Sequence, residues 1–207
     1  MNYEIILATN NKHKLKEVRE ILTPEGIIVY GLSDLGLVPE DVDENGSTYY
    51  ENALIKAKAV QKLTILPIIS DDSGIEISAL NNEPGIHSSR YAESFGGYPK
   101  TFEHIFEILK ETKDRSARFV CDIVLLNVDK KPLLFEGIVE GEIALNTRGN
   151  SDFGYDPIFI CNEVGLTYAE MSEEEKNIHS HRAKALKKLV TYLKVNQLIT
   201  KPIHHHH

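Results

Sequence analysis

The sequence predicts an α/β protein in which a mixed sheet is flanked by helices. Three observations lead to this prediction. The first 30 residues alternate strand, helix and strand, the apolar run at 65–69 ends in adjacent carboxylates, and residues 120–139 have the pattern of a long hairpin. The opening β-α-β unit and the antiparallel hairpin together indicate a sheet with both kinds of strand pairing.

The amino-terminal half of the chain supplies the strand–helix alternation. Residues 4–8 form an apolar strand, a helix follows, and residues 27–30 resume a strand. Thr48 and Glu51 have the spacing of a capping box, so a second helix begins there and leads into a strand that we expect to end at Asp71. The inward-facing positions are Leu15, Val18, Ile21 and Leu22 in the first helix, and Ala53, Leu54, Ala57 and Val60 in the second.

The carboxyl-terminal half adds an antiparallel pair and two helices. Residues 120–128 and 133–139 predict two strands joined by a polar turn, and residues 158–160 predict a short strand. One helix follows Pro99, and the last helix runs from about Ser180. Their inward-facing positions are Phe102, Ile105, Phe106 and Leu109, and then Ala185, Leu186, Leu189 and Leu193.

Length and organisation indicate a single domain. A chain of 207 residues buries about 70% of its unfolded surface, which suffices for one domain or for two lobes that share a core. No internal repeat or linker divides the sequence. We therefore expect one domain at 1–203, followed at 204–207 by four histidines that look like the remnant of an expression tag.

Composition further predicts a cytoplasmic protein. The amino end has no basic segment before its apolar residues, and no apolar run is long enough to span a bilayer. Cys121 and Cys161 have no paired spacing and are expected to be reduced thiols. The net charge of −8 argues against nucleic-acid partners and membrane surfaces, because both require a basic face.

Two acidic segments form a candidate magnesium site. The tetrapeptide Asp71-Asp72-Ser73-Gly74 is expected at the carboxyl end of a strand, where α/β proteins bind ligands, although these residues also form ordinary turns. Glu44 lies in the acidic loop 40–46, which could equally be a solvated surface segment. Mg²⁺ takes one or two protein carboxylates and otherwise keeps water and phosphate oxygens, so Glu44 and Asp72 suit it.

The segment from Thr9 to Lys14 is a candidate phosphate loop between the first strand and the first helix. Cations at a helix start oppose the macrodipole, whereas a bound anion would make them favourable. Exposed amides, the Thr9 hydroxyl, the Asn11 amide and the Lys14 ammonium would form a triphosphate cradle without the Walker pattern. A solvated lysine-rich turn accounts for the same residues equally well.

Two further segments carry polar or aromatic groups that packing does not explain. Phe153, next to Gly154, could stack on a nucleobase, although isolated aromatics more often complete a core. Ser180 is a good N-cap, and His181 and Arg182 again place cations at the unfavourable end of a helix. His181 in isolation would more often be a hydrogen-bonded structural histidine.

Six motifs in order cover nearly the whole chain. They are Thr9-x-Asn11-x-x-Lys14, Glu44-x-Gly46 before Glu51-Asn52-Ala53, Asp71-Asp72-Ser73-Gly74, Pro84-Gly85 with Ser89-Arg90-Tyr91, Phe153-Gly154-Tyr155-Asp156-Pro157, and Glu175-Lys176-x-x-x-Ser180-His181-Arg182. With them the chain resembles the inosine triphosphate pyrophosphatase family. It differs at Asn10, where glycine or serine is frequent, and at Tyr155, where some relatives carry another aromatic.

The resemblance implies an elongated two-lobed fold with a central active cleft, and a Mg²⁺-dependent cytosolic homodimer. It implies hydrolysis of noncanonical purine nucleoside triphosphates such as ITP, dITP and XTP to the monophosphate and pyrophosphate. Asp72 would act as general base and metal ligand, and Glu44 would hold the same Mg²⁺. The implied substrate-binding residues are Thr9, Asn10, Asn11, Lys12, His13, Lys14 and Ser73 around the phosphates, Phe153, Gly154, Tyr155 and Asp156 around the base, and Lys176, His181 and Arg182 at the purine edge.

The implied residues suggest both a mechanism and a basis for selectivity. Asp72 would deprotonate a water that attacks the α-phosphorus, and Lys14 would stabilise the departing pyrophosphate. Lys176 and Arg182 carry only hydrogen-bond donors, so they pair with a 6-oxo purine and not with adenine. The alternatives are a non-catalytic nucleotide-binding regulatory module and a fold-related pyrophosphatase that acts on pyrimidine or modified nucleotides.

Overall fold

The computed structural model describes residues 2–200, and the four histidines at 204–207 lie outside them. The strands are β1 (Tyr3–Leu7), β2 (Ile27–Tyr30), β3 (Ile68–Ile77), β4 (Glu83–Pro84), β5 (Ser116–Leu126), β6 (Leu133–Ile143), β7 (Phe159–Cys161) and β8 (Leu166–Thr167). The α-helices are α1 (Lys12–Leu22), α2 (Tyr49–Gln61), α3 (Ser88–Ser94), α4 (Tyr98–Leu109), α5 (Glu173–His179) and α6 (His181–Val195).

These strands form one mixed sheet, as the sequence predicts. The strand order is β2-β1-β3-β5-β6-β7-β8, and β4 pairs with β3 outside this path. β1 pairs in parallel with β2 and β3, whereas the other pairs are antiparallel. The β1–β2 pair comes from the opening β-α-β unit, and α2 then returns the chain so that β3 also runs parallel to β1.

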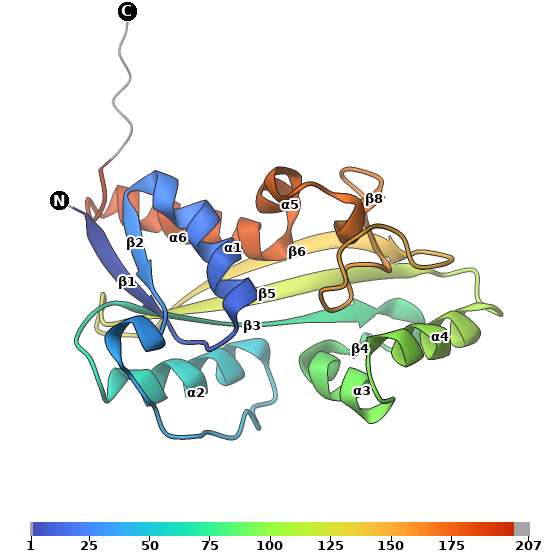
Figure 1. Ribbon diagram of the computed structural model, residues 1–207, viewed down its shortest axis with the longest axis horizontal. Coiled ribbons are helices and arrows are strands. Elements are labelled where there is room, and N and C mark those ends of the chain that lie inside the picture. The colour runs from blue at the N-terminus through green and yellow to red at the C-terminus, as the bar shows by residue number, and fades with distance from the viewer. Residues whose placement is uncertain (1, 201–207) are drawn as a thin grey trace, which may run out of the picture.

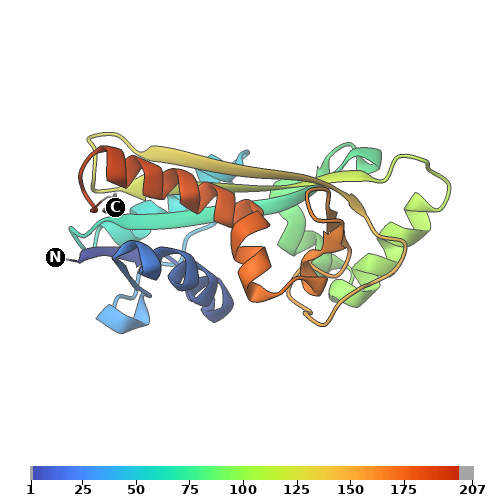
Figure 2. The ribbon, with the colours of Figure 1, turned by 90° about the horizontal axis from the view of Figure 1, so that it is seen from above.

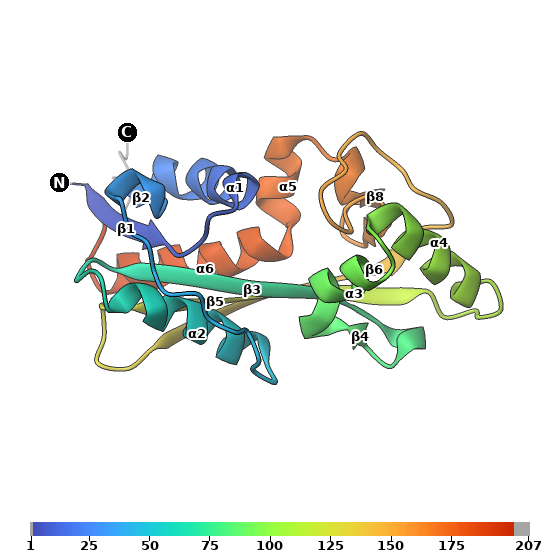
Figure 3. The same cartoon turned by 60° about the horizontal axis from the view of Figure 1, so that its bottom comes forward.

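The molecule is elongated, with two lobes joined by the long strands β3, β5 and β6 (Figure 1). One lobe contains β1, β2, α1, α2 and most of α6, and the other contains α3, α4, β7 and β8 (Figures 1 and 3). In the first lobe α2 covers one face of the sheet, while α1 and α6 cover the other; Figure 2 shows α6 lying along the strands. Among residues 2–200, no helix is both long enough and apolar enough to cross a membrane.

Three apolar clusters stabilise this arrangement. One joins α1 and α6 to the sheet around Ile69 and Leu125, and a second joins α2 to the opposite face around Ile68 and Val124. The third forms the core of the other lobe, around Phe159 and neighbouring aromatics. Adjacent residues of β3 and β5 therefore serve different clusters, because side chains alternate between the two faces of a strand.

Most predicted helix starts are confirmed by their caps. Thr48 caps α2 and Ser180 caps α6 as predicted, and Asn11 caps α1, a role that was not predicted for it; each accepts from a backbone N–H three residues later. The capping box at Thr48 is only half formed, because the Glu51 carboxylate accepts from the backbone N–H of Ser47 at 2.6 Å. The helices α3 and α5 and the strand β8 are short elements that the sequence patterns did not predict.

The predicted end of the central strand is wrong. The strand does not stop at Asp71 but continues as β3 to Ile77, and every residue of β3 has a partner in β5. The paired backbone of β5 satisfies the N–H and C=O groups of a segment whose side chains alone favour a turn. The two aspartates consequently lie inside a strand.

Candidate active site

Alternation along β3 separates Asp71 from Asp72. Asp71 is buried on the side of α1 and α6, where Lys14 Nζ lies 2.9 Å from its Oδ1 and Arg182 Nε lies 3.0 Å from its Oδ2. Burial opposes ionisation of Asp71, but Lys14 and Arg182 outweigh it and hold the pKa of this carboxyl well below its usual range. Asp71 is therefore a fixed negative charge that positions two cations.

Asp72 faces α2 on the opposite side of the sheet. Its Oδ2 lies 3.5 Å from the side-chain nitrogen of Asn52. Burial raises the pKa of Asp72 to about 6, with further contributions from Asp71 and Glu44 and an opposing one from Lys56. A carboxylate with a pKa near neutrality can accept a proton at physiological pH, which is the property of a general base.

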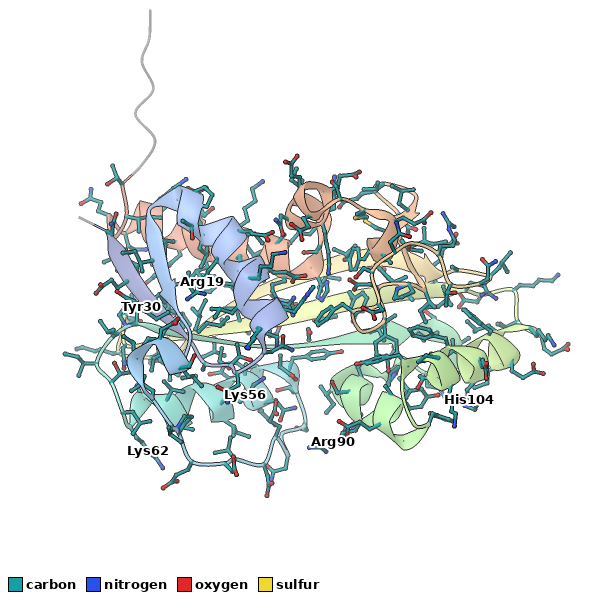
Figure 4. The ribbon with its side chains drawn as sticks, in the orientation of Figure 1. Arg19, Tyr30, Lys56, Lys62, Arg90 and His104 are labelled. Atoms are coloured by element: carbon teal, nitrogen blue, oxygen red, sulfur yellow. The ribbon has the colours of Figure 1, made fainter. Side chains whose placement is uncertain are left out.

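Lys56 connects the two predicted magnesium ligands. From α2 its ammonium lies 3.1 Å from Glu44 Oε1 and donates to the carbonyl oxygen of Asp71 at 2.6 Å, and Figure 4 shows its side chain directed at the sheet. Burial opposes its charge, but Asp71 and Glu44 raise the pKa of Lys56, so it stays protonated. The sequence gives no signal for Lys56, because a lysine within a helix is ordinarily a solvent-exposed residue.

The donor set around Lys56 fits magnesium. Glu44 and Asp72 offer carboxylate oxygens, the ligands that Mg²⁺ prefers. The negative charge of Glu44 is close enough to Asp72 to help raise its pKa. Within residues 2–200 no group of three or more His, Cys, Asp or Glu side chains could hold a metal on its own. Two carboxylates therefore suit an ion that completes its shell with water and substrate oxygens.

A cavity of about 680 Å³ between the lobes collects most of the predicted substrate-binding residues. Those in its lining are Asn11, His13, Lys14, Ser73, Phe153, Gly154, Tyr155, Asp156, Lys176, His181 and Arg182. Thr9, Asn10 and Glu44 line a second cavity of about 700 Å³, which also contains Lys56. Lys12 and Asp72 belong to neither lining, but Asp72 lies in β3 next to Ser73 of the first cavity and interacts with Lys56 of the second.

Two glycines allow the elements around the first cavity to approach closely. A Cβ atom on Gly137 of β6 would lie 2.0 Å from the carbonyl oxygen of His181, so only glycine lets the first turn of α6 lie against the sheet. This close packing of α6 against the sheet places the guanidinium of Arg182 beside the carboxylate of Asp71. A Cβ atom on Gly74 would lie 2.0 Å from the carbonyl oxygen of Gly85, so this glycine is needed where β3 meets the second lobe.

Glu17 is the central residue that sequence reasoning missed. This buried residue of α1 lies 3.0 Å from His13 Nε2 and 2.7 Å from Lys176 Nζ, and it also pairs with Arg182. Burial opposes its ionisation, but Arg182 and Lys176 outweigh burial and lower the pKa of Glu17 to about 2. A glutamate in a lysine-rich helix gives no sequence signal, because its partners lie 159 and 165 residues away.

The three predicted cationic contacts are not free donors. Lys14 pairs with Asp71, and Lys176 lies 2.7 Å from Glu17 and 2.6 Å from Asp156. Arg182 pairs with both Asp71 and Glu17 and is only 4% exposed. The sequence argument treated Lys176 and Arg182 as unengaged, whereas here each is oriented by two carboxylates.

His181 and Tyr155, two further predicted substrate-binding residues, are both buried. His181 is buried and stacked on Phe119 with ring centroids 4.4 Å apart, and burial lowers its pKa well below the usual value, so its ring is neutral. Tyr155 is also buried, and its hydroxyl donates to the carbonyl oxygen of Ser88 at 2.6 Å. His181 thus has the environment of a structural histidine at the cavity wall, and Tyr155 belongs to the core of the second lobe.

Arg90 links the two lobes at the acidic loop. Its guanidinium donates to the carbonyl oxygen of Glu44 at 2.9 Å, and Figure 4 shows the side chain between α3 and that loop. The backbone of one candidate metal ligand is therefore held from the opposite lobe.

Comparisons with known proteins by family, by sequence and by structure agree with one another. Residues 5–192 match the model of the Ham1 family. The dITP/XTP pyrophosphatase of Bacillus subtilis strain 168 is 44% identical over 188 residues, covering 90% of this chain and 94% of that protein. The dITP/XTP pyrophosphatase of Staphylococcus aureus strain MRSA252 is 41% identical over 194 residues, covering 94% of this chain and 98% of that protein.

Solved structures share the fold over the same extent. The Staphylococcus aureus Ham1 protein superimposes with a TM-score of 0.79 at 40% identity, covering 93% of this chain and 99% of that chain. A HAM1 protein from Coxiella burnetii gives a TM-score of 0.80 at 42% identity, with the same coverage.

Proposed function

The chain belongs to the Ham1 family, and from this premise we propose that it hydrolyses noncanonical purine nucleoside triphosphates. The substrates are dITP, ITP and XTP, and the products are the nucleoside monophosphate and pyrophosphate. The single observation that carries the proposal is the environment of Asp72. Its pKa is raised to about 6 beside Lys56 and Glu44, and it lies next to a cavity large enough for a nucleotide. Relatives that match nearly the whole chain have the same named activity.

Asp72 acts as the general base in this proposal. It accepts the proton of a water that attacks the α-phosphorus; the ionised carboxylate is the form that does so, and bound Mg²⁺ would favour that form. Glu44 and Asp72 would hold Mg²⁺, which would supply positive charge to the phosphate oxygens. Lys14, oriented by Asp71, stabilises the departing pyrophosphate together with the amides at the start of α1.

The base lies in the cavity near Phe153. Lys176 uses two contacts to carboxylates, so one of its three N–H donors is left for a ligand, and Arg182 likewise has more N–H donors than its two ion pairs engage. These N–H groups donate hydrogen bonds to the oxygen of a 6-oxo purine, whereas the 6-amino group of adenine offers them no acceptor and leaves them unpaired. Each unpaired buried donor costs about 1–3 kcal/mol, which disfavours ATP by roughly 5- to 150-fold per lost bond.

We place the activity on one domain at 1–203 that acts as a cytoplasmic homodimer. The continuous strands β3, β5 and β6 support one domain, and the two unpaired cysteines suit a reducing compartment. The net charge of −8 disfavours nucleic-acid and membrane partners. Sedimentation of the purified protein tests the homodimer.

A substrate panel tests the proposed function. Pyrophosphate release is measured for ITP, dITP, XTP, GTP and ATP, with and without Mg²⁺. We expect release from the first three only with Mg²⁺, and a loss of about 10²- to 10⁴-fold in Asp72→Asn. Equal specificity constants for ITP and GTP would contradict the proposal. Tight nucleotide binding without release would instead indicate a regulatory module.

A further inference from the structure

Phe153 already carries an aromatic partner. The imidazole ring of His13 is stacked on the phenyl ring, with ring centroids 3.9 Å apart and planes inclined by 19°. His13 comes from the first turn of α1 and Phe153 from the loop between β6 and β7, and both line the cavity between the lobes. The stack therefore closes one face of the only ring for which we have proposed a base-stacking role.

The spacing of the two rings leaves no place for a base between them. Carbon atoms in contact lie about 3.5–4.0 Å apart, so two rings that sandwich a purine are separated by about 7 Å. Lys176 also approaches the Phe153 ring, with its Nζ 5.2 Å from the centroid. A purine can stack on the face that His13 covers only if one of the two rings moves.

We propose that the purine stacks on the face of Phe153 that His13 covers in this structure, so that His13 competes with the base and the two rings must separate before the base can stack there. The inference rests on the proposed function, since it takes Phe153 as the ring that receives the base. His13 then sets the affinity for purine nucleotides, because each binding event must first break the stack.

The surroundings of both rings permit this separation. The side chain of His13 is 42% exposed, and its one polar contact is with Glu17. Glu17 keeps Lys176 and Arg182 as partners when His13 leaves, so no buried charge is abandoned. Phe153 is followed by Gly154, which has a φ of +53° and no atom within 4 Å of an added Cβ, so nothing packs against the loop at that point.

Removing the ring at position 13 tests the proposal. An aromatic pair is worth about 0.5–1.5 kcal/mol, so we expect His13→Ala to lower KM for ITP by roughly 2- to 12-fold. The dissociation constant of inosine monophosphate, measured by calorimetry without Mg²⁺, should fall by the same factor. His13→Gln can keep the hydrogen bond from the position of Nε2 to Glu17 without a ring and should behave like His13→Ala, whereas His13→Phe keeps a stacking ring and should retain the wild-type affinity.

A double-mutant cycle shows whether the effect passes through Phe153. In a Phe153→Leu background, His13→Ala should leave the dissociation constant unchanged. Weaker or unchanged binding in both His13→Ala and His13→Gln would overturn the inference, and so would equal tightening in the Phe153→Leu background. Failure of the proposed function is separate, because the wild-type protein would then release no pyrophosphate from ITP.

Discussion

The carboxyl groups of Asp71 and Asp72 belong to adjacent residues, yet their pKa values are shifted in opposite directions. The pKa of Asp71 is held low by Lys14 and Arg182 against the effect of burial, whereas burial raises that of Asp72 to about 6. The strand itself causes this division, because consecutive side chains of β3 project into different environments on the two faces of the sheet.

Substitution of the two aspartates should therefore affect stability differently. Asp71→Asn leaves Lys14 and Arg182 without their shared carboxylate, and loss of one partner from a buried ion pair costs about 3–5 kcal/mol. Asp72→Asn removes a charge that burial disfavours, so its melting temperature should equal or exceed that of the wild type. Thermal denaturation at pH 7 measures both. A larger loss of stability in Asp72→Asn than in Asp71→Asn would contradict this assignment.

The pH dependence of turnover should follow the ionisation of Asp72. Because the base must be ionised, kcat/KM should rise with pH through about 6 when Mg²⁺ is scarce and then reach a plateau. Mg²⁺ favours the ionised carboxylate, so the midpoint should move to lower pH as its concentration increases. Specificity constants at several Mg²⁺ concentrations test this, and a midpoint that does not respond to Mg²⁺ would separate Asp72 from the metal.

Glu17 should contribute to acid stability. Its pKa is lowered from 4.5 to about 2, so the stabilisation is complete above pH 4.5 and is lost as the pH falls towards 2. A shift of this size corresponds to roughly 3 kcal/mol. Glu17→Gln should be less stable than the wild type at pH 7 and show a smaller further loss between pH 4.5 and 2, measured by urea denaturation. Parallel pH profiles for the two proteins would argue against this role.

The pKa of Asp122 is shifted in the opposite direction to that of Glu17, so its effect on stability has the opposite dependence on pH. It is the register partner of Asp72 in β5, its Oδ1 is buried without a hydrogen-bond partner, and burial together with Glu136 raises its pKa to about 8. The native state therefore loses stability as the pH rises from 3.8 towards 8. Asp122→Asn should remove this pH dependence and stabilise the protein at pH 8 by about 1–3 kcal/mol. An unchanged free energy of unfolding at pH 8 would contradict the prediction.

Local features of the fold were predictable because they depend on neighbouring residues. The caps at Thr48 and Ser180 and the hairpin of β5 and β6 all follow from short-range spacing and periodicity. The continuation of β3 beyond Asp71 was not predictable in the same way, because β5, about fifty residues later in the chain, provides its hydrogen-bond partners. Polar residues that favour a turn in isolation are held in a strand by that pairing.

The sequence by itself determined the mixed sheet, the helix starts and most of the residues that line the cavity between the lobes. Only the tertiary structure decided which carboxylate pairs with which cation. It places Lys14, Lys176 and Arg182 against Asp71 and Glu17. It also places Lys56 in the region between Glu44 and Asp72. The physical reason is that charge and pKa depend on burial and on groups within a few ångströms. Residues more than a hundred positions apart acquire such neighbours only when the chain folds.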